Sequence, residues 1–202
     1  MKFKELVEKA RTCRVFCQEE IPAKDLDDLI DMARITPSAR NAQILRYVIA
    51  QDKNFRAKLE ESFVLGGALP PEQKPQRGKD SPAAVIVFLA PQEITQFGIM
   101  DIGIAAQTIQ LGATEKGYAA CIIGAFKKEL VADILQKEGV SFFDEESGAK
   151  LLPYLLMIVG KPNQEREITA VPKDGKTTYY HDERGCHMVP KRALKDILLL
   201  HK

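Results

Sequence analysis

The chain has 202 residues, of which 45% are hydrophobic, so it has enough apolar material for one continuous core. Its 29 basic and 28 acidic side chains leave a formal charge of +1, which provides no overall field to attract nucleic acid or an anionic membrane. No apolar run reaches the ~20 residues of a membrane span and the first residues lack the apolar stretch of a secretory signal, so we expect a cytoplasmic protein without nucleic-acid or membrane partners.

The first half of the chain predicts helices, a polar loop and a strand. Apolar residues at helical spacing predict one helix over residues 2–12 and a second that follows Pro22 and ends before Pro37. The loop 36–43 is rich in hydroxyl and amide groups, and the apolar run 44–50 is expected to form a strand. Asp52 is expected to cap a helix that runs to Phe63. Residues 66–80 lack periodicity and are expected to form a surface loop or lid.

The second half contains three apolar runs, 83–90, 119–123 and 154–159, which predict buried strands. Between the first two, residues 99–116 predict a long helix with apolar residues spread around its circumference. Such a helix is either the centre of a monomer core or packs against its copy in a homodimer, and the second interpretation is favoured because a small domain seldom buries so long a helix alone. Residues 163–202 are expected to form a C-terminal arm of one domain that spans 1–202, with helical spacing again at 194–200.

Several common signatures are absent. The chain has no GxGxxG or GxxxxGK[ST] motif for direct nucleotide binding and no GxSxG elbow for an α/β-hydrolase. His181, Cys186 and His187 are metal-ligand types, but adjacent residues usually point in different directions and no fourth ligand is spaced to join them, so no metal site is predicted. Cys186 with His187 could also be a nucleophile and base, although such a sequence neighbourhood is usually coincidence.

Cations and amides in separate segments offer a more coherent set. Arg11 and Arg14 follow the first helix and Lys191-Arg192 precede the last one, and such groups can hold a phosphate by charge-assisted hydrogen bonds where no P-loop exists. The loop 36–43 offers a hydroxyl and two amides, which suit the donor and acceptor edge of a planar heterocycle. Taken alone, the first set could be solvated surface charge and the second an ordinary polar turn.

These pieces occur in an order that resembles the FMN-dependent nitroreductase family. The motifs similar to the family's are Arg11-Thr12-Cys13-Arg14-Val15-Phe16, the loop Pro37-Ser38 with Asn41 and Gln43, the central helix with Asp101, Gly103, Ala105-Ala106-Gln107 and Leu111-Gly112-Ala113, its continuation Ile122-Ile123-Gly124-Ala125-Phe126, and Val159-Gly160-Lys161-Pro162 with Val189-Pro190-Lys191-Arg192. Together they span most of the chain. Departures are Ala10, where many members have a further arginine, Thr12 in place of serine, and Ile44-Leu45 in place of Pro-Trp.

The resemblance implies an α+β fold of the nitroreductase-like α/β sandwich type, with a central mixed sheet flanked by helices and the long buried helix at a homodimer interface. It implies two FMN sites, each built from both subunits. Carried over by position, the FMN-binding residues are Arg11 near the phosphate, Thr12, Arg14 near the pyrimidine side, Pro37, Ser38, Asn41 and Gln43 from the partner subunit, the backbone at Ile123 and Gly124 under the ring, and Lys191 and Arg192 at the phosphate. No side chain is assigned as a catalytic acid or base.

The implied activity is ping-pong transfer of electrons from NADH or NADPH, through FMN, to a small electrophilic acceptor such as a nitroaromatic or a quinone. The scaffold does not fix the reaction, so a flavin-dependent dehydrogenase or dehalogenase stays open. Two non-catalytic alternatives are an FMN carrier or redox sensor and a flavin-free interaction protein. The physiological substrate is not predicted.

Overall fold

The strands of the protein form two separate sheets. The computed structural model describes residues 1–202. The helices are α1 (Phe3–Lys9), α2 (Ala23–Arg34), α3 (Lys53–Glu60), α4 (Gln96–Glu115) and α5 (Lys128–Lys137). The strands are β1 (Arg46–Ala50), β2 (Ala84–Pro91), β3 (Ala119–Ile123), β4 (Leu151–Gly160), β5 (Arg166–Ala170), β6 (Tyr180–His181) and β7 (His187–Lys191). Short 3-10 turns lie at Ala39–Asn41, Pro71–Gln73 and Leu194–Asp196.

The larger sheet has the strand order β1-β2-β4-β3, and each neighbouring pair in it is antiparallel. The central sheet was expected to be mixed, but within one chain it is fully antiparallel. The parallel pair, β5 with β7, belongs to the smaller sheet. Apolar runs in the sequence indicate burial but carry no information on strand direction. The strands predicted from these runs are confirmed, with β3 at the predicted residues and β4 longer than predicted.

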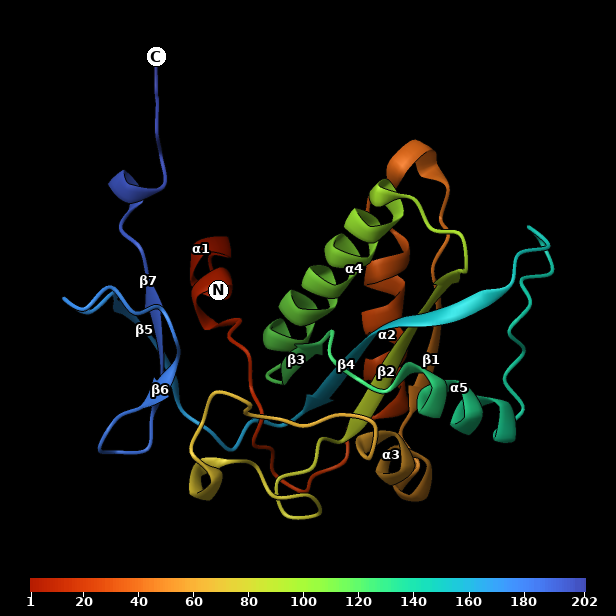
Figure 1. The fold of residues 1–202 in the computed structure, drawn as a ribbon, viewed down its shortest axis with the longest axis horizontal. Coiled ribbons are helices and arrows are strands. Elements are labelled where there is room, and N and C mark those ends of the chain that lie inside the picture. Colours follow the sequence, from red (N-terminus) through yellow and green to blue (C-terminus); the bar gives the residue numbers. More distant parts are fainter.

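Alternate residues of β2 point to opposite faces of this sheet and so enter two separate cores. Val85 and Val87 belong to the core that includes side chains of α3 and α5. Ile86 and Phe88 belong to the core that includes side chains of α2 and α4. Figure 1 shows the resulting layers, with helices on both faces of the sheet. The α+β sandwich predicted from the sequence is confirmed.

Helix α4 is buried on one side only within the chain. Ala106 and Ile109 lie in the core against α2 and the sheet, and a Cβ added at Gly112 would come within 2.5 Å of the Met32 sulfur, so the two helices approach closely there. The opposite side of α4 exposes Phe97 and Met100, at 53% and 59%. The apolar residues around the whole circumference therefore serve the core on one side and leave an uncovered apolar face on the other.

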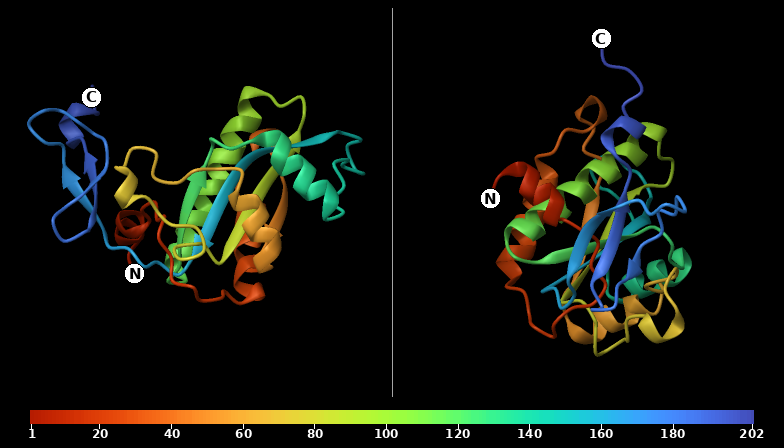
Figure 2. Two further views of the ribbon diagram at one scale, coloured as in Figure 1. Left: turned by 60° about the horizontal axis from the view of Figure 1, so that its bottom comes forward. Right: turned by 90° about the vertical axis from the view of Figure 1, so that its left-hand side faces the viewer.

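The smaller sheet has the order β5-β7-β6 and is formed by the C-terminal part of the chain. It stands apart from the larger sheet, next to α1, in Figure 1 and in the left view of Figure 2. Beyond it, the helix expected at 194–200 is reduced to the turn Leu194–Asp196, and Leu199 is 93% exposed. No helix in the structure has the length and apolarity needed to cross a bilayer.

The other helix boundaries follow local hydrogen bonds. Asp52 caps α3 as predicted, because its carboxylate accepts from the amides of Asn54 and Phe55 at 2.9 Å, but the helix ends at Glu60 and not at Phe63. Helix α1 ends at Lys9, before the predicted Thr12, because the chain leaves the helix to run beside β3.

Candidate functional site

A cavity of about 190 Å³ lies between the segment after α1, helix α4 and strand β7. Four of the predicted site residues, Arg11, Thr12, Arg14 and Lys191, line it together. The cavity also contains residues that the sequence analysis did not assign, namely Gln107 and Gln110 of α4, Tyr179 and His187. Segments from opposite ends of the chain thus meet at one place.

The segment that carries the two arginines is held at the edge of the larger sheet. The Cys13 amide donates to the Ala120 carbonyl of β3 at 3.0 Å, and the Cys17 amide donates to the Lys161 carbonyl at 2.9 Å. Cys13 and Phe16 are fully buried in the core. Because these residues anchor the segment, Arg14 between them is fixed at the cavity wall.

The cavity has an excess of positive charge. None of Arg11, Arg14, Lys191 and the adjacent Arg166 of β5 takes part in an ion pair with a carboxylate. Arg166 Nη1 donates to the Arg11 carbonyl at 3.1 Å, and the Nε atoms of both arginines are buried without a hydrogen-bond partner. Burial and the nearby Arg166 lower the pKa of Arg11. Uncompensated cations beside a cavity favour the binding of an anion.

His187 forms the part of the wall behind Arg14. Its side chain is 1% exposed, and its Nε2 atom lies 3.5 Å from Arg14 Nη1. The Arg14 guanidinium also lies over the Tyr179 ring, 4.5 Å from its centroid. Burial, followed by the charges of Arg14, His181 and Arg166, lowers the pKa of His187 to about 4, so the imidazole is neutral at neutral pH. The sequence suggested His187 only as a metal ligand or as a base for Cys186.

A second group of predicted residues lines a separate groove of about 1210 Å³ near the amino-terminal end of α4. Pro37, Ser38 and Gln43 contribute to it from the loop before β1. Arg40, Asn41 and Gln43 have φ values of 55°, 54° and 47°, which are unfavourable for residues with side chains and are maintained only where the surroundings enforce them.

Two hydrogen bonds enforce that loop conformation. The backbone amide of Gln43 donates to Ser38 Oγ at 3.2 Å, and the backbone amide of Ala39 donates to the buried Asp101 carboxylate of α4 at 3.0 Å. The loop is therefore fastened to the central helix.

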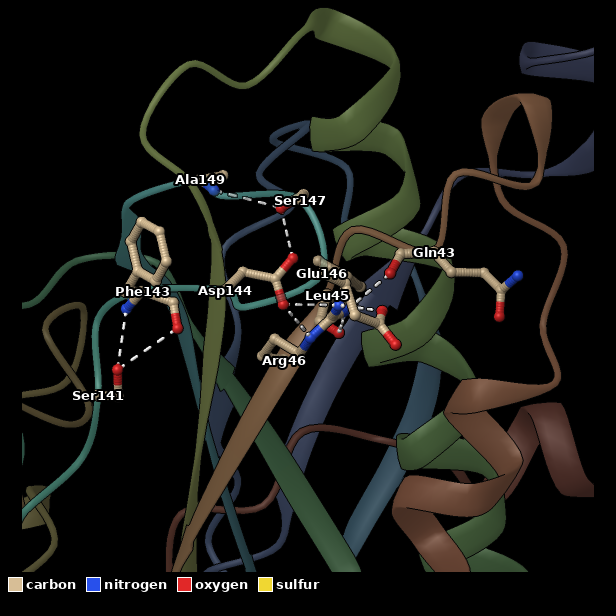
Figure 3. Close-up of polar contacts among 9 residues, drawn as sticks. All are labelled: Gln43, Leu45, Arg46, Ser141, Phe143, Asp144, Glu146, Ser147 and Ala149. Atoms are coloured by element: carbon tan, nitrogen blue, oxygen red, sulfur yellow. Dashed lines mark hydrogen bonds and ion pairs between the residues drawn. The ribbon is translucent and has the colours of Figure 1, made fainter.

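The other wall of the groove is the loop 141–149, which Figure 3 shows next to the start of β1. Arg46 Nη2 lies 2.9 Å from Asp144 and 3.2 Å from Glu146, while Arg46 Nη1 donates to the Gln43 carbonyl at 2.9 Å. Ser147 and Arg46 lower the pKa of Asp144, so this carboxylate stays charged. One arginine thus joins the two loops that border the groove.

Within one chain the two groups of site residues do not meet. Asp101, which holds the loop, and Gln110, which lines the cavity, are nine positions apart on α4, or about 14 Å along the helix axis. Asn41, Gly124 and Arg192 are exposed, and Ile123 is buried in a core. Arg192 follows the last residue of β7 and does not line the cavity, whereas Lys191 does. The assignments of these residues to a cofactor stay predictions.

The fold and the cavity define a three-layer α+β protein with a positively charged cavity beside its central helix. Residues 7–160, more than half of the chain, match the model of the Nitroreductase family. The chain belongs to this family.

Individual relatives are distant. An Archaeoglobus fulgidus protein, whose name proposes an NADH dehydrogenase or NAD(P)H nitroreductase, is 24% identical over 123 residues, which are 59% of this chain and 65% of that protein. The chain therefore aligns with slightly less than two thirds of this relative. The structure of a Nitroreductase Family Protein from Streptococcus pneumoniae has a TM-score of 0.65 at 19% identity and covers 86% of this chain and 97% of its own. A proposed nitroreductase from Desulfovibrio desulfuricans, in complex with FMN, has a TM-score of 0.66 at 15% identity, with 98% and 96% covered.

Proposed function

We propose that the protein is an FMN-dependent oxidoreductase that uses NADH or NADPH to reduce a small electrophilic acceptor, such as a nitroaromatic or a quinone. The observation that carries the proposal is the cavity with Arg11, Arg14 and Lys191, whose charges have no carboxylate partner. Family membership and a structural neighbour described with FMN support the choice of FMN as the anion.

The residues of the cavity suit the terminal phosphate of a mononucleotide. A phosphate dianion needs several N–H donors, and Arg11, whose Nε atom has no hydrogen-bond partner, lines the cavity together with Arg14 and Lys191. Partnerless buried donors are uncommon in folded proteins, and the one on Arg11 belongs to a residue that lines the cavity. The chain has no dinucleotide fingerprint that would hold the adenosine of FAD.

A homodimer would complete the site. The uncovered face of α4 with Phe97, Met100 and Ile104 is suited to a second copy of the chain, because this much exposed apolar surface is unfavourable in water. A two-fold axis through the middle of α4 pairs the amino-terminal half of one helix with the carboxyl-terminal half of the other. With this pairing, the loop 36–43 of the partner subunit would lie near the cavity. Gln107, which lines the cavity, is exposed on the same side of α4 as the uncovered apolar face.

Bound FMN supplies the two-electron chemistry, and the chain supplies binding, orientation and electrostatics. Arg11 and Lys191 hold the phosphate. Arg14 would lie at the pyrimidine edge of the bound flavin, where a cation would stabilise the negative charge of the reduced ring. Ser38, Asn41 and Gln43 hydrogen-bond to the heterocycle. With FMN bound, the nicotinamide and then the acceptor would use the same site in turn, which would give ping-pong kinetics, and no side chain of the chain is assigned as an acid or base.

The test begins with the absorbance spectrum of the purified protein and chromatography of the cofactor that it releases on denaturation. We expect FMN, and bleaching of the flavin spectrum when NADH or NADPH is added without oxygen, followed by turnover with a quinone or a nitroaromatic. Recovery of FAD, or of no flavin after reconstitution with excess FMN, would overturn the proposal. A protein that holds FMN but oxidises neither nicotinamide would be a carrier or sensor.

A further inference from the structure

We propose that His187 is a positioning residue for Arg14: it is a neutral acceptor that orients the guanidinium at the cavity wall without cancelling its charge. The inference rests on the proposed function only for what Arg14 then contacts, the flavin. The contact itself is a property of the chain. No catalytic role for the imidazole is involved.

The geometry places Arg14 between two partners that carry no negative charge. Arg14 Nη1 is 3.5 Å from His187 Nε2, and the guanidinium lies 4.5 Å from the centroid of the Tyr179 ring. The Tyr179 and His187 rings are themselves 4.9 Å apart, so both partners belong to one packed group. A carboxylate at position 187 would hold the arginine more strongly but would neutralise the charge that an anionic or reduced ligand needs.

The direction of the hydrogen bond fixes the tautomer. A guanidinium can only donate, so His187 Nε2 must carry the lone pair and Nδ1 the proton. Nδ1 is buried and has no hydrogen-bond partner, which is unfavourable for the folded chain. An unfavourable arrangement of this kind is retained where the group has a task, and here the one polar contact of the imidazole is with Arg14.

All charged or titratable groups that face His187 disfavour its protonation or are neutral. They are Arg14 from the segment after α1, Arg166 from β5, His181 from β6, whose ring centroid is 5.3 Å away, and Tyr179. Together with burial, they lower the pKa of His187 to about 4. The imidazole therefore stays an acceptor over the pH range in which a cytoplasmic enzyme works.

Additional contacts link this arrangement to the smaller sheet. Gln164 Oε1 accepts from the Arg14 backbone amide at 3.5 Å, and Gln164 Nε2 lies 3.2 Å from His181 Nε2. Tyr179, His181 and His187 come from the C-terminal arm, whereas Arg14 comes from the opposite end of the chain. The arm thus supplies Lys191 to the cavity and also orients Arg14.

The experiment uses three variants and two readouts. His187→Phe keeps an aromatic ring but removes the acceptor, His187→Gln keeps an acceptor, and Lys137→Ala removes an exposed charge on α5 as a matched control. In the FMN-loaded protein we expect His187→Phe to weaken the binding of reduced FMN relative to oxidised FMN roughly tenfold. This change lowers the two-electron midpoint potential of the flavin by about 30 mV. His187→Gln should retain most of the wild-type potential and Lys137→Ala all of it.

The second readout needs no flavin. NMR titration of the apoprotein gives the pKa of His187, with the exposed His201 as an internal reference, and we expect this pKa to rise in Arg14→Ala and to stay unchanged in Lys137→Ala. An unchanged pKa in Arg14→Ala, or equal potentials for the Phe and Gln variants, would overturn the role of His187. If the wild-type protein takes up no FMN, the proposed function fails, while the titration still decides whether His187 contacts Arg14.

Discussion

The backbone amide of Ala39 donates to the carboxylate of Asp101 at 3.0 Å, which connects the polar loop before β1 to the central helix. Asp101 is buried, and Arg40, Asn41 and Gln43, which follow Ala39 in the loop, have positive φ values. The carboxylate therefore compensates for an unfavourable backbone path. This relationship makes α4 a common support for the loop, the cavity and the uncovered apolar face.

Removal of that support should release the loop. We expect Asp101→Ala to lower the free energy of unfolding by about 1.5–3 kcal/mol, because a hydrogen bond to a charged group is lost and the Ala39 amide is left without a partner. FMN affinity should fall as well, since the loop is proposed to contact the flavin. Urea unfolding and FMN titration measure both effects, with Glu115→Ala on the exposed part of α4 as control. An unchanged FMN affinity would show that the loop does not contribute to flavin binding.

The uncovered face of α4 predicts the oligomeric state. We expect a homodimer that does not dissociate without losing FMN, and Met100→Glu should produce a monomer with weak flavin binding, because a charge would be buried at the interface. Val64→Glu is a matched control, since Val64 is 74% exposed but lies away from α4. Light scattering over a dilution series decides the matter. A monomeric wild-type protein that retains FMN would contradict the shared site.

Sequence reasoning succeeded where the signal was local. The strands β2 and β3 are continuous apolar runs, and the capping carboxylate of Asp52 stands directly before its helix. It missed Arg166, whose place beside Arg11 and His187 depends on the pairing of β5 with β7, and no pattern in a polar segment predicts that pairing. It considered His187 with its sequence neighbour Cys186, whereas the contact that matters in the structure is with Arg14, which is remote in sequence.

The cavity explains why some predicted residues were brought together and others were not. Arg11, Arg14 and Lys191 line one cavity, while Ser38 and Gln43 line a groove at the other end of α4. The family resemblance assigned the two groups to different subunits. Lys191, the last residue of β7, lines the cavity, whereas Arg192 directly after the strand does not, and two adjacent cations in a sequence do not show which of them faces a cavity.

Two cations of the site should have different effects on the flavin. Arg14→Ala should lower the midpoint potential and slow reduction by the nicotinamide, because a charge-assisted contact of roughly 1.5–3 kcal/mol made chiefly with the reduced ring is worth about a tenfold to hundredfold effect. Lys191→Ala should weaken FMN binding but leave the potential nearly unchanged, since a phosphate contact is the same in both redox states. Redox titration and FMN dissociation measurements separate the roles. The opposite pattern would mean that the flavin binds in the reverse orientation, with its phosphate at Arg14 and its pyrimidine edge at Lys191.

Acidification should destabilise the protein through His187. The folded-state pKa of His187 is lowered to about 4, below its usual value near 6.5, so the unfolded chain binds more protons between these two pH values. Stability should therefore fall as the pH is lowered through this window, by about 2 kcal/mol from this residue between pH 7 and pH 5. Urea unfolding of the wild-type protein and of His187→Gln at both pH values provides the measurement. The glutamine variant has no imidazole to protonate, so its loss of stability should be smaller by that amount. Equal losses in the two proteins would mean that His187 titrates normally in the folded chain, which would also remove the basis for a neutral acceptor beside Arg14.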